Sequence, residues 1–187
     1  MCDYITAILP PGVDPDSVSS IFEEHKFGFE LIVNPHLAKQ VEPGAWQVMT
    51  TRGQCDCGTA IGSLTRPEGE KEPNFDRELT KFRAQGWSEA KIQRWLDQKS
   101  QVQERHKRED DHQAQGSTAE LDQWINLIND LLNTGKARWL GLLLHTYHRG
   151  IESERITIVS REKVMLAELT AAQLMKLKQD VVYEFAV

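Results

Sequence analysis

A polar stretch at residues 99–116 decides where this chain can build a core. Its composition is that of a helix, but Val102 and Ala114 are its only aliphatic residues. A segment of this kind buries little apolar surface, so it predicts a protruding helix end or a mobile linker. The core must therefore form from the residues on either side, and a chain of 187 residues is long enough for one domain with an appendage.

The residues before the polar stretch begin with a β-rich region. Residues 3–9 alternate in polarity and end at a Pro-Pro-Gly sequence, which predicts a strand that stops there. Asp14 followed by Pro15 predicts the N-cap and the first position of a short helix. Residues 29–33 and 46–51 predict two further strands, separated by a loop.

Helices are predicted on both sides of the polar stretch. The apolar spacing before it predicts two helices, the second capped by Ser88, which form a hairpin inserted at residues 75–116. After it, Ser117 and Glu120 have the spacing of a capping box, which predicts that a new helix begins there. The apolar stripe of that helix ends at Gly135.

The C-terminal part returns to strands. Residues 139–147 and 155–159 are strand-like and predict an antiparallel pair. A capping box at Thr170 predicts a last helix, and residues 181–185 predict a last strand. Because strands and helices do not alternate as in a doubly wound fold, we expect an α+β fold, with a mostly antiparallel sheet and helices packed on one side. We expect residues 1–187 to form a single domain.

The charge of the chain bears on its partners. The net charge is −6, and residues 1–64 carry eight acids and three bases, whereas residues 65–116 carry eleven of each. An acidic surface repels phosphate backbones, and no Lys/Arg stripe with interleaved aromatic residues is present, which argues against nucleic-acid binding and favours a basic protein partner. The candidate partner-binding residues are Asp14, Asp16, Glu23 and Glu24.

The location of the protein follows from what the sequence lacks. No apolar run approaches the roughly 20 residues that span a bilayer, and the first residues have no basic start followed by a long apolar run. We therefore expect no membrane partner and a cytoplasmic location. Three cysteines argue against a disulfide framework and leave reduced thiols or a metal site open.

The most specific local motif is Cys55-Asp56-Cys57-Gly58. In an extended segment the two thiols point the same way and can hold one metal ion. A tetrahedral zinc site needs four ligands, so Cys2 and a histidine are needed to complete it. His36, His145 and His148 are candidates, and the last two face opposite sides if they lie on a strand. The predicted metal ligands are Cys2, Cys55, Cys57 and His145.

Two alternatives to a metal site stay open for these cysteines. They can be small buried residues of a tight turn, or they can exchange a disulfide between them. The chain has no P-loop, no Gly-x-Gly-x-x-Gly after a strand, no nucleophile elbow and no His-Glu-x-x-His. Common nucleotide and hydrolase chemistries therefore lack support, and no catalytic residue is assigned.

Two motifs of the chain also carry a resemblance. Through Cys55-Asp56-Cys57-Gly58-Thr59 and Gly141-Leu142-Leu143-Leu144-His145, with Cys2 near the start, most of the chain resembles a family of uncharacterised bacterial proteins. The resemblance implies a bacterial cytoplasmic protein and marks Cys2, Cys55, Cys57 and His145 as residues to test. It implies no activity.

Three hypotheses follow for function. The first is a non-enzymatic protein-binding module without a cofactor, for example an inhibitor or immunity-type protein that binds a basic partner. The alternative is a thiol-dependent or zinc-binding protein or enzyme centred on Cys55 and Cys57. The third is a structural subunit that oligomerises through residues 75–132.

Overall fold

The computed structural model of this protein describes residues 2–65 and 76–187. The chain divides into two compact units. The sheet unit comprises Met1–Arg66 and Ser117–Val187, and the helical unit comprises Pro67–Gly116.

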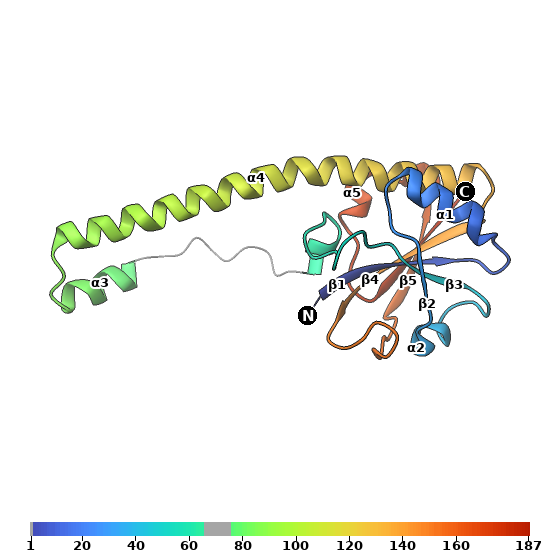
Figure 1. Cartoon of the computed structure of the whole chain (residues 1–187), viewed down its shortest axis with the longest axis horizontal. Helices are drawn as coiled ribbons and strands as arrows, with labels where there is room; N and C mark the ends of the chain where they lie inside the picture. The colour runs from blue at the N-terminus through green and yellow to red at the C-terminus, as the bar shows by residue number, and fades with distance from the viewer. Residues whose placement is uncertain (1, 66–75) are drawn as a thin grey trace. The chain divides into compact units, whose positions relative to one another are not determined.

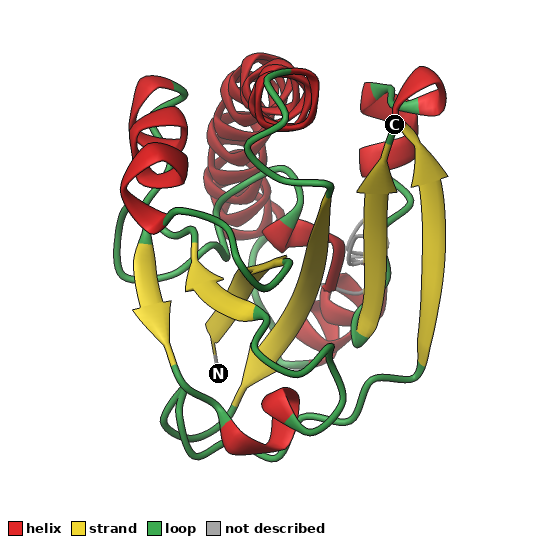
Figure 2. Ribbon diagram, turned by 90° about the vertical axis from the view of Figure 1, so that its right-hand side faces the viewer, coloured by secondary structure: helices red, strands yellow, loops and turns green. Residues whose placement is uncertain are grey.

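A six-stranded sheet organises the sheet unit. Its strands follow the order β2-β3-β1-β4-β6-β5, and every neighbouring pair is antiparallel except β5 and β6. Figure 2 shows those two parallel strands side by side, near the C-terminus. The predicted α+β class with a mostly antiparallel sheet is therefore confirmed. The strands are β1 (Cys2–Leu9), β2 (Glu30–Ile32), β3 (Trp46–Met49), β4 (Trp139–Tyr147), β5 (Ser160–Met165) and β6 (Val181–Ala186).

Helices in this unit begin at capping residues that the sequence contains. The Asp14 side chain accepts a hydrogen bond from the Asp16 backbone N–H, and Thr170 accepts one from Gln173. Asn34 caps a one-turn helix in a segment predicted to be a loop. The helices are α1 (Pro15–Glu24), α2 (Pro35–Ala38), α4 (Glu89–Asn133), which enters from the helical unit, and α5 (Ala171–Leu174), with short 3₁₀ helices at Gly62–Thr65 and Leu166–Glu168.

Side chains alternate along the strands, so the sheet has two differently covered faces. The larger apolar cluster joins one face to the longer helices, through residues such as Phe22 of α1 and Trp124 and Ile128 of α4. A smaller cluster covers the other face, which we call the second face, and includes Leu37 of α2 and Ile156. The described helices include none that is both long enough and apolar enough to cross a membrane.

The predicted helix start at Ser117 is wrong. Helix α4 runs without a break from Glu89 to Asn133, as Figure 1 also shows, so residues 99–116 are helical. Their composition is rich in residues that favour a helix, such as Gln, Glu, Lys and Arg. The Glu120 side chain, instead of closing a capping box, accepts a hydrogen bond from the Ala60 backbone N–H.

The predicted antiparallel pair of residues 139–147 and 155–159 is also wrong. The first range forms β4, but the next strand, β5, begins only at Ser160 and pairs in parallel with β6. Residues 155–159 form no strand because side chains bind their backbone groups: Gln40 accepts from the Ile158 N–H and donates to the Ile156 carbonyl.

The helical unit contains α3 (Asp76–Ala84) and the beginning of α4. Between them the chain turns at Gly86, whose φ of 75° suits glycine. Phe82 stacks on Trp87 with ring centroids 4.3 Å apart and meets Trp95 edge-on. Residue 75, the first residue of the predicted hairpin insertion, lies outside the described residues. That this hairpin is an insertion within a single domain stays a prediction.

Candidate metal centre

The Cys-Asp-Cys motif lies beside the first residues of β1, beyond the end of β3. The Asp56 backbone N–H donates to the Asp3 carbonyl at 2.8 Å, and the Asp3 N–H donates to Cys57 Sγ at 3.1 Å. This contact continues the edge of β1 where β3, whose last residue is Met49, no longer pairs with it. Cys2, the first residue of β1, is therefore brought beside the motif.

Hydrogen bonds to the Asp56 side chain hold this loop in place. Its Oδ2 accepts hydrogen bonds from the Ile5 backbone N–H at 2.8 Å and from the Thr51 hydroxyl at 2.6 Å. Burial raises the pKa of Asp56, and these two hydrogen bonds oppose the rise. The residue between the two cysteines is thus a buried anchor, and the cysteines on either side of it stay partly exposed.

Close backbone packing at Gly62 and a hydrogen bond from Ala60 to Glu120 also hold the loop in place. A Cβ on Gly62 would lie 1.9 Å from the Asp56 carbonyl oxygen, so only glycine fits there without moving the backbone. Glu120 of α4 accepts a hydrogen bond from the Ala60 N–H at 2.9 Å. Burial raises the pKa of Glu120, and its hydrogen bond to Ala60 opposes the rise.

The structure brings three free thiols together. The sulfur atoms of Cys2, Cys55 and Cys57 all lie within 4.8 Å of one another. A Zn–S bond is about 2.3 Å, which places sulfurs about 3.8 Å apart in a tetrahedral site. Movements of the order of 1 Å or less would therefore bring the three sulfurs onto one ion, and they can hold it as thiolates.

The surroundings of Cys57 disfavour its thiolate in the metal-free protein. The Asp3 N–H lowers the pKa of the Cys57 thiol and is the largest single influence on it, but burial, Cys55 and the Asp3 charge together raise that pKa above its ordinary value. The thiolate is the nucleophile and the metal ligand, so Cys57 is not poised for nucleophilic attack at neutral pH. A metal ion that binds here must displace its proton.

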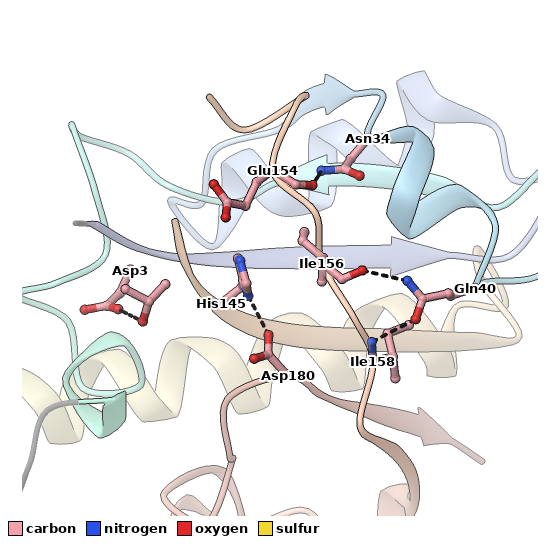
Figure 3. A network of polar contacts seen from close by, with 9 residues as sticks. Asp3, Asn34, Gln40, His145, Glu154, Ile156, Ile158 and Asp180 are labelled. Carbon is pink, nitrogen blue, oxygen red and sulfur yellow. Dashed lines mark hydrogen bonds and ion pairs between the residues drawn. The ribbon is translucent and has the colours of Figure 1, made fainter. Parts of the chain in front are cut away.

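His145 lies apart from the three sulfurs. It sits on β4 opposite Tyr4 of β1, on the second face, and its ring contacts Tyr147 with centroids 4.6 Å apart. Its Nδ1 forms a hydrogen bond with Asp180 Oδ1, drawn as a dashed line in Figure 3, with the two atoms 2.5 Å apart. Its buried Nε2 has no hydrogen-bond partner among the described residues. The three-sulfur group contains no ligand atom of His145, so a role for this residue as a ligand stays a prediction.

The other predicted residues are spread over the sheet unit. His36 lies on α2, and His148 is exposed just after β4. Neither belongs to the three-sulfur group. The acidic residues predicted to bind a partner are exposed at the start and end of α1, and Asp14 among them also caps that helix: Asp14, Asp16, Glu23 and Glu24.

Sequence reasoning missed the residues that support the site. Asp56 could have been found from its place between two cysteines, because a buried carboxylate in a tight turn commonly binds backbone N–H groups. Gly62 and Glu120 gave no signal for this role, since it depends on contacts with distant parts of the chain. Comparisons with family models, curated proteins and solved structures found no match to this chain.

Proposed function

We propose that this protein binds one soft divalent metal ion, with zinc as the first candidate, through the thiolates of Cys2, Cys55 and Cys57. The observation that carries the proposal is the convergence of three free sulfurs from two segments far apart in the sequence. Buried cysteines that serve only packing need no such convergence, and here all three side chains are partly exposed.

The charges around the sulfurs favour a dication. Three thiolates carry three negative charges, and the carboxylate of Asp3 adds to the negative field at Cys57. Burial also raises the pKa of Tyr4, which lies beside the motif, and Cys2 is the next largest influence in the same direction. A divalent ion neutralises more of this charge than a monovalent one. Sulfur ligands select zinc and other thiophilic ions over magnesium or calcium.

The number of protein ligands indicates the type of site. Among the described residues, no fourth ligand atom belongs to the three-sulfur group. Structural zinc sites are usually closed by four protein ligands, whereas sites with three protein ligands keep a position for solvent or an external ligand. An open position on a partly exposed surface suits an ion that exchanges or that binds a second molecule.

Metal titration of the full-length reduced protein tests the proposal. We expect one equivalent of Co²⁺ to give the intense thiolate-to-metal absorption of sulfur ligation, and one equivalent of Zn²⁺ to abolish it. Native mass spectrometry should report the same stoichiometry. Single Cys2→Ser, Cys55→Ser and Cys57→Ser changes should each weaken binding by about tenfold or more, because each removes one of three ligands.

Two outcomes would remove support for the proposal. One is the absence of stoichiometric metal with all three thiols reduced. The other is binding that survives Cys57→Ser unchanged. His145→Gln serves as the matched comparison, because His145 lies outside the three-sulfur group: equal affinity fits a three-sulfur site, and a loss of affinity equal to that of a cysteine change would add His145 to it.

The first hypothesis from the sequence receives no separate support from the site. A protein-binding role through the acidic residues of α1, including an inhibitor or immunity-type role, stays a prediction. So do the bacterial origin and the cytoplasmic location that the resemblance implies. Charge reversal of Glu23 and Glu24, followed by binding measurements against basic proteins, would test the protein-binding role.

A further inference from the structure

A pocket on the second face of the sheet unit lies outside the metal centre. Its volume is about 310 Å³, near the lower end of the range for small-molecule sites. One wall comes from α2 and the residues after it, and the other comes from the segment that follows β4. The lining residues are His36, Lys39, Gln40, Arg155, Ile156 and Thr157.

Two amide side chains hold the walls of this pocket together. Gln40 Nε2 donates to the His36 and Ile156 carbonyls, both at 2.8 Å, and its Oε1 accepts from the Ile158 N–H at 2.9 Å. Asn34 Nδ2 donates to the Ile151 and Glu154 carbonyls. Figure 3 shows Gln40 between Ile156 and Ile158 and Asn34 directed at Glu154. The pocket is therefore already formed, and binding a ligand need not order its walls.

The lining is basic although the chain as a whole is acidic. It contains Lys39, Arg155 and His36 and no carboxylate, whereas the net charge of the chain is −6. Within the described ranges, no ion pair or hydrogen bond engages the Lys39 or Arg155 side chain. Both residues are exposed to solvent, and both line the pocket without a counter-ion from the described residues.

Two acids close in sequence to the lining residues, Glu42 and Glu154, are already engaged. Both Glu42 oxygens accept from Arg138, at 2.6 and 2.7 Å. The Glu154 carboxylate accepts from the Arg149 backbone N–H at 2.8 Å. Neither acid pairs with Lys39 or Arg155, so an external anion can neutralise these two cations.

We propose that this pocket binds the phosphate group of a small soluble phosphomonoester. The guanidinium of Arg155 can bind two phosphate oxygens through its fork of N–H groups, and the ammonium of Lys39 supplies a second charge from the opposite wall. His36 and Thr157 add hydrogen-bonding side chains at the same pocket. The volume suits one phosphate with a small organic group and excludes large polyanions from its interior.

Isothermal titration calorimetry on the full-length protein tests the proposal, with phenyl phosphate as the probe at constant ionic strength. We expect saturable binding of one equivalent. Arg155→Gln and Lys39→Gln should each weaken it by about tenfold or more, because each removes a charge-assisted contact. Lys136→Gln, which removes an exposed lysine that does not line the pocket, should leave the affinity unchanged. Addition of a metal chelator should also change nothing, which separates this site from the metal centre.

Other outcomes would overturn the proposal. Absence of saturable binding at millimolar phenyl phosphate would do so, and so would equal losses in Lys136→Gln and Arg155→Gln. Binding to phosphatidic acid vesicles without binding to phenyl phosphate would assign the basic residues to a membrane surface instead. Equal affinity for sulfate and phenyl phosphate would reduce the site to a general anion contact.

Discussion

Two irregular segments of the sheet unit lie against the sheet, and side chains hold both in place. The thiol loop, residues 53–59, continues the edge of β1. The covering segment, residues 150–158, crosses the second face. The thiol loop is held by its own Asp56 and by close backbone packing at Gly62. The covering segment is held by amide side chains of distant residues, Asn34 and Gln40.

This difference suits the two proposed sites. A metal centre needs ligand atoms placed to within a fraction of an ångström, and a loop anchored by a buried carboxylate against backbone supplies that precision. An anion pocket works through longer-range charge attraction, so walls joined by side-chain amides are sufficient. The thiol loop should therefore be the less tolerant of the two segments to substitution.

The largest expected effect comes from Gly62→Ala. The new Cβ would meet the Asp56 carbonyl oxygen at 1.9 Å, and this oxygen belongs to the backbone and cannot rotate away. We expect a loss of about 3 kcal/mol or more in the free energy of unfolding, measured by urea denaturation. Gly58→Ala is the matched control, because a Cβ there meets nothing within 4 Å. Equal losses in the two variants would mean that the loop is not held by backbone packing.

Gln40→Ala should have the next largest effect. It leaves the Ile158 N–H and the Ile156 carbonyl without their partner, at a cost of about 2 kcal/mol in unfolding free energy. Hydrogen exchange should rise in the covering segment and stay unchanged in the thiol loop. Gln179→Ala, at an exposed position, is the control. A rise of similar size in both segments would show that they are not independent.

A smaller change in the free energy of unfolding is expected when the pH changes. It comes from Glu120, which binds the Ala60 N–H directly after the thiol loop. Burial raises the pKa of Glu120, so the folded protein binds this proton more tightly than the unfolded chain does. The stability that this group contributes is therefore complete below its unfolded pKa of about 4 and is lost as pH rises through the raised folded pKa. Glu120→Gln should gain stability relative to the unchanged protein over that window. The exposed Glu168→Gln should show no such gain.

Sequence pattern predicted much of the sheet unit because local chemistry decides its regular elements. The strand at residues 3–9, the helix after Asp14 and the strand at residues 139–147 follow from alternation and capping, which depend on neighbours in the sequence. Cys2, Cys55 and Cys57, three of the four predicted ligands, also lie together, although residues 56–58 form bends and turns instead of the extended segment that the prediction assumed.

The errors of prediction arise where distant contacts override local pattern. Ser117 and Glu120 have capping-box spacing, but Glu120 binds the Ala60 N–H and the helix continues. Residues 155–159 have the composition of a strand, but Gln40 binds their backbone groups. Neither partner can be identified from spacing alone, because each lies far away in the sequence.

The smallest predicted effect uses two tyrosines as a matched pair, one for each segment. Tyr4 donates its hydroxyl to the Gln54 carbonyl of the thiol loop at 2.6 Å, whereas the Tyr147 hydroxyl is buried on the second face near the Thr6 side chain, without a hydrogen bond of good geometry among the described residues. Tyr4→Phe should therefore lose about 0.5–1 kcal/mol in unfolding free energy. Tyr147→Phe should lose less than Tyr4→Phe, because it keeps the ring and removes a buried hydroxyl whose contact with Thr6 lacks good hydrogen-bond geometry. If Tyr147→Phe instead costs more than Tyr4→Phe, the second face depends on a polar contact of Tyr147, and the contrast between the two segments fails.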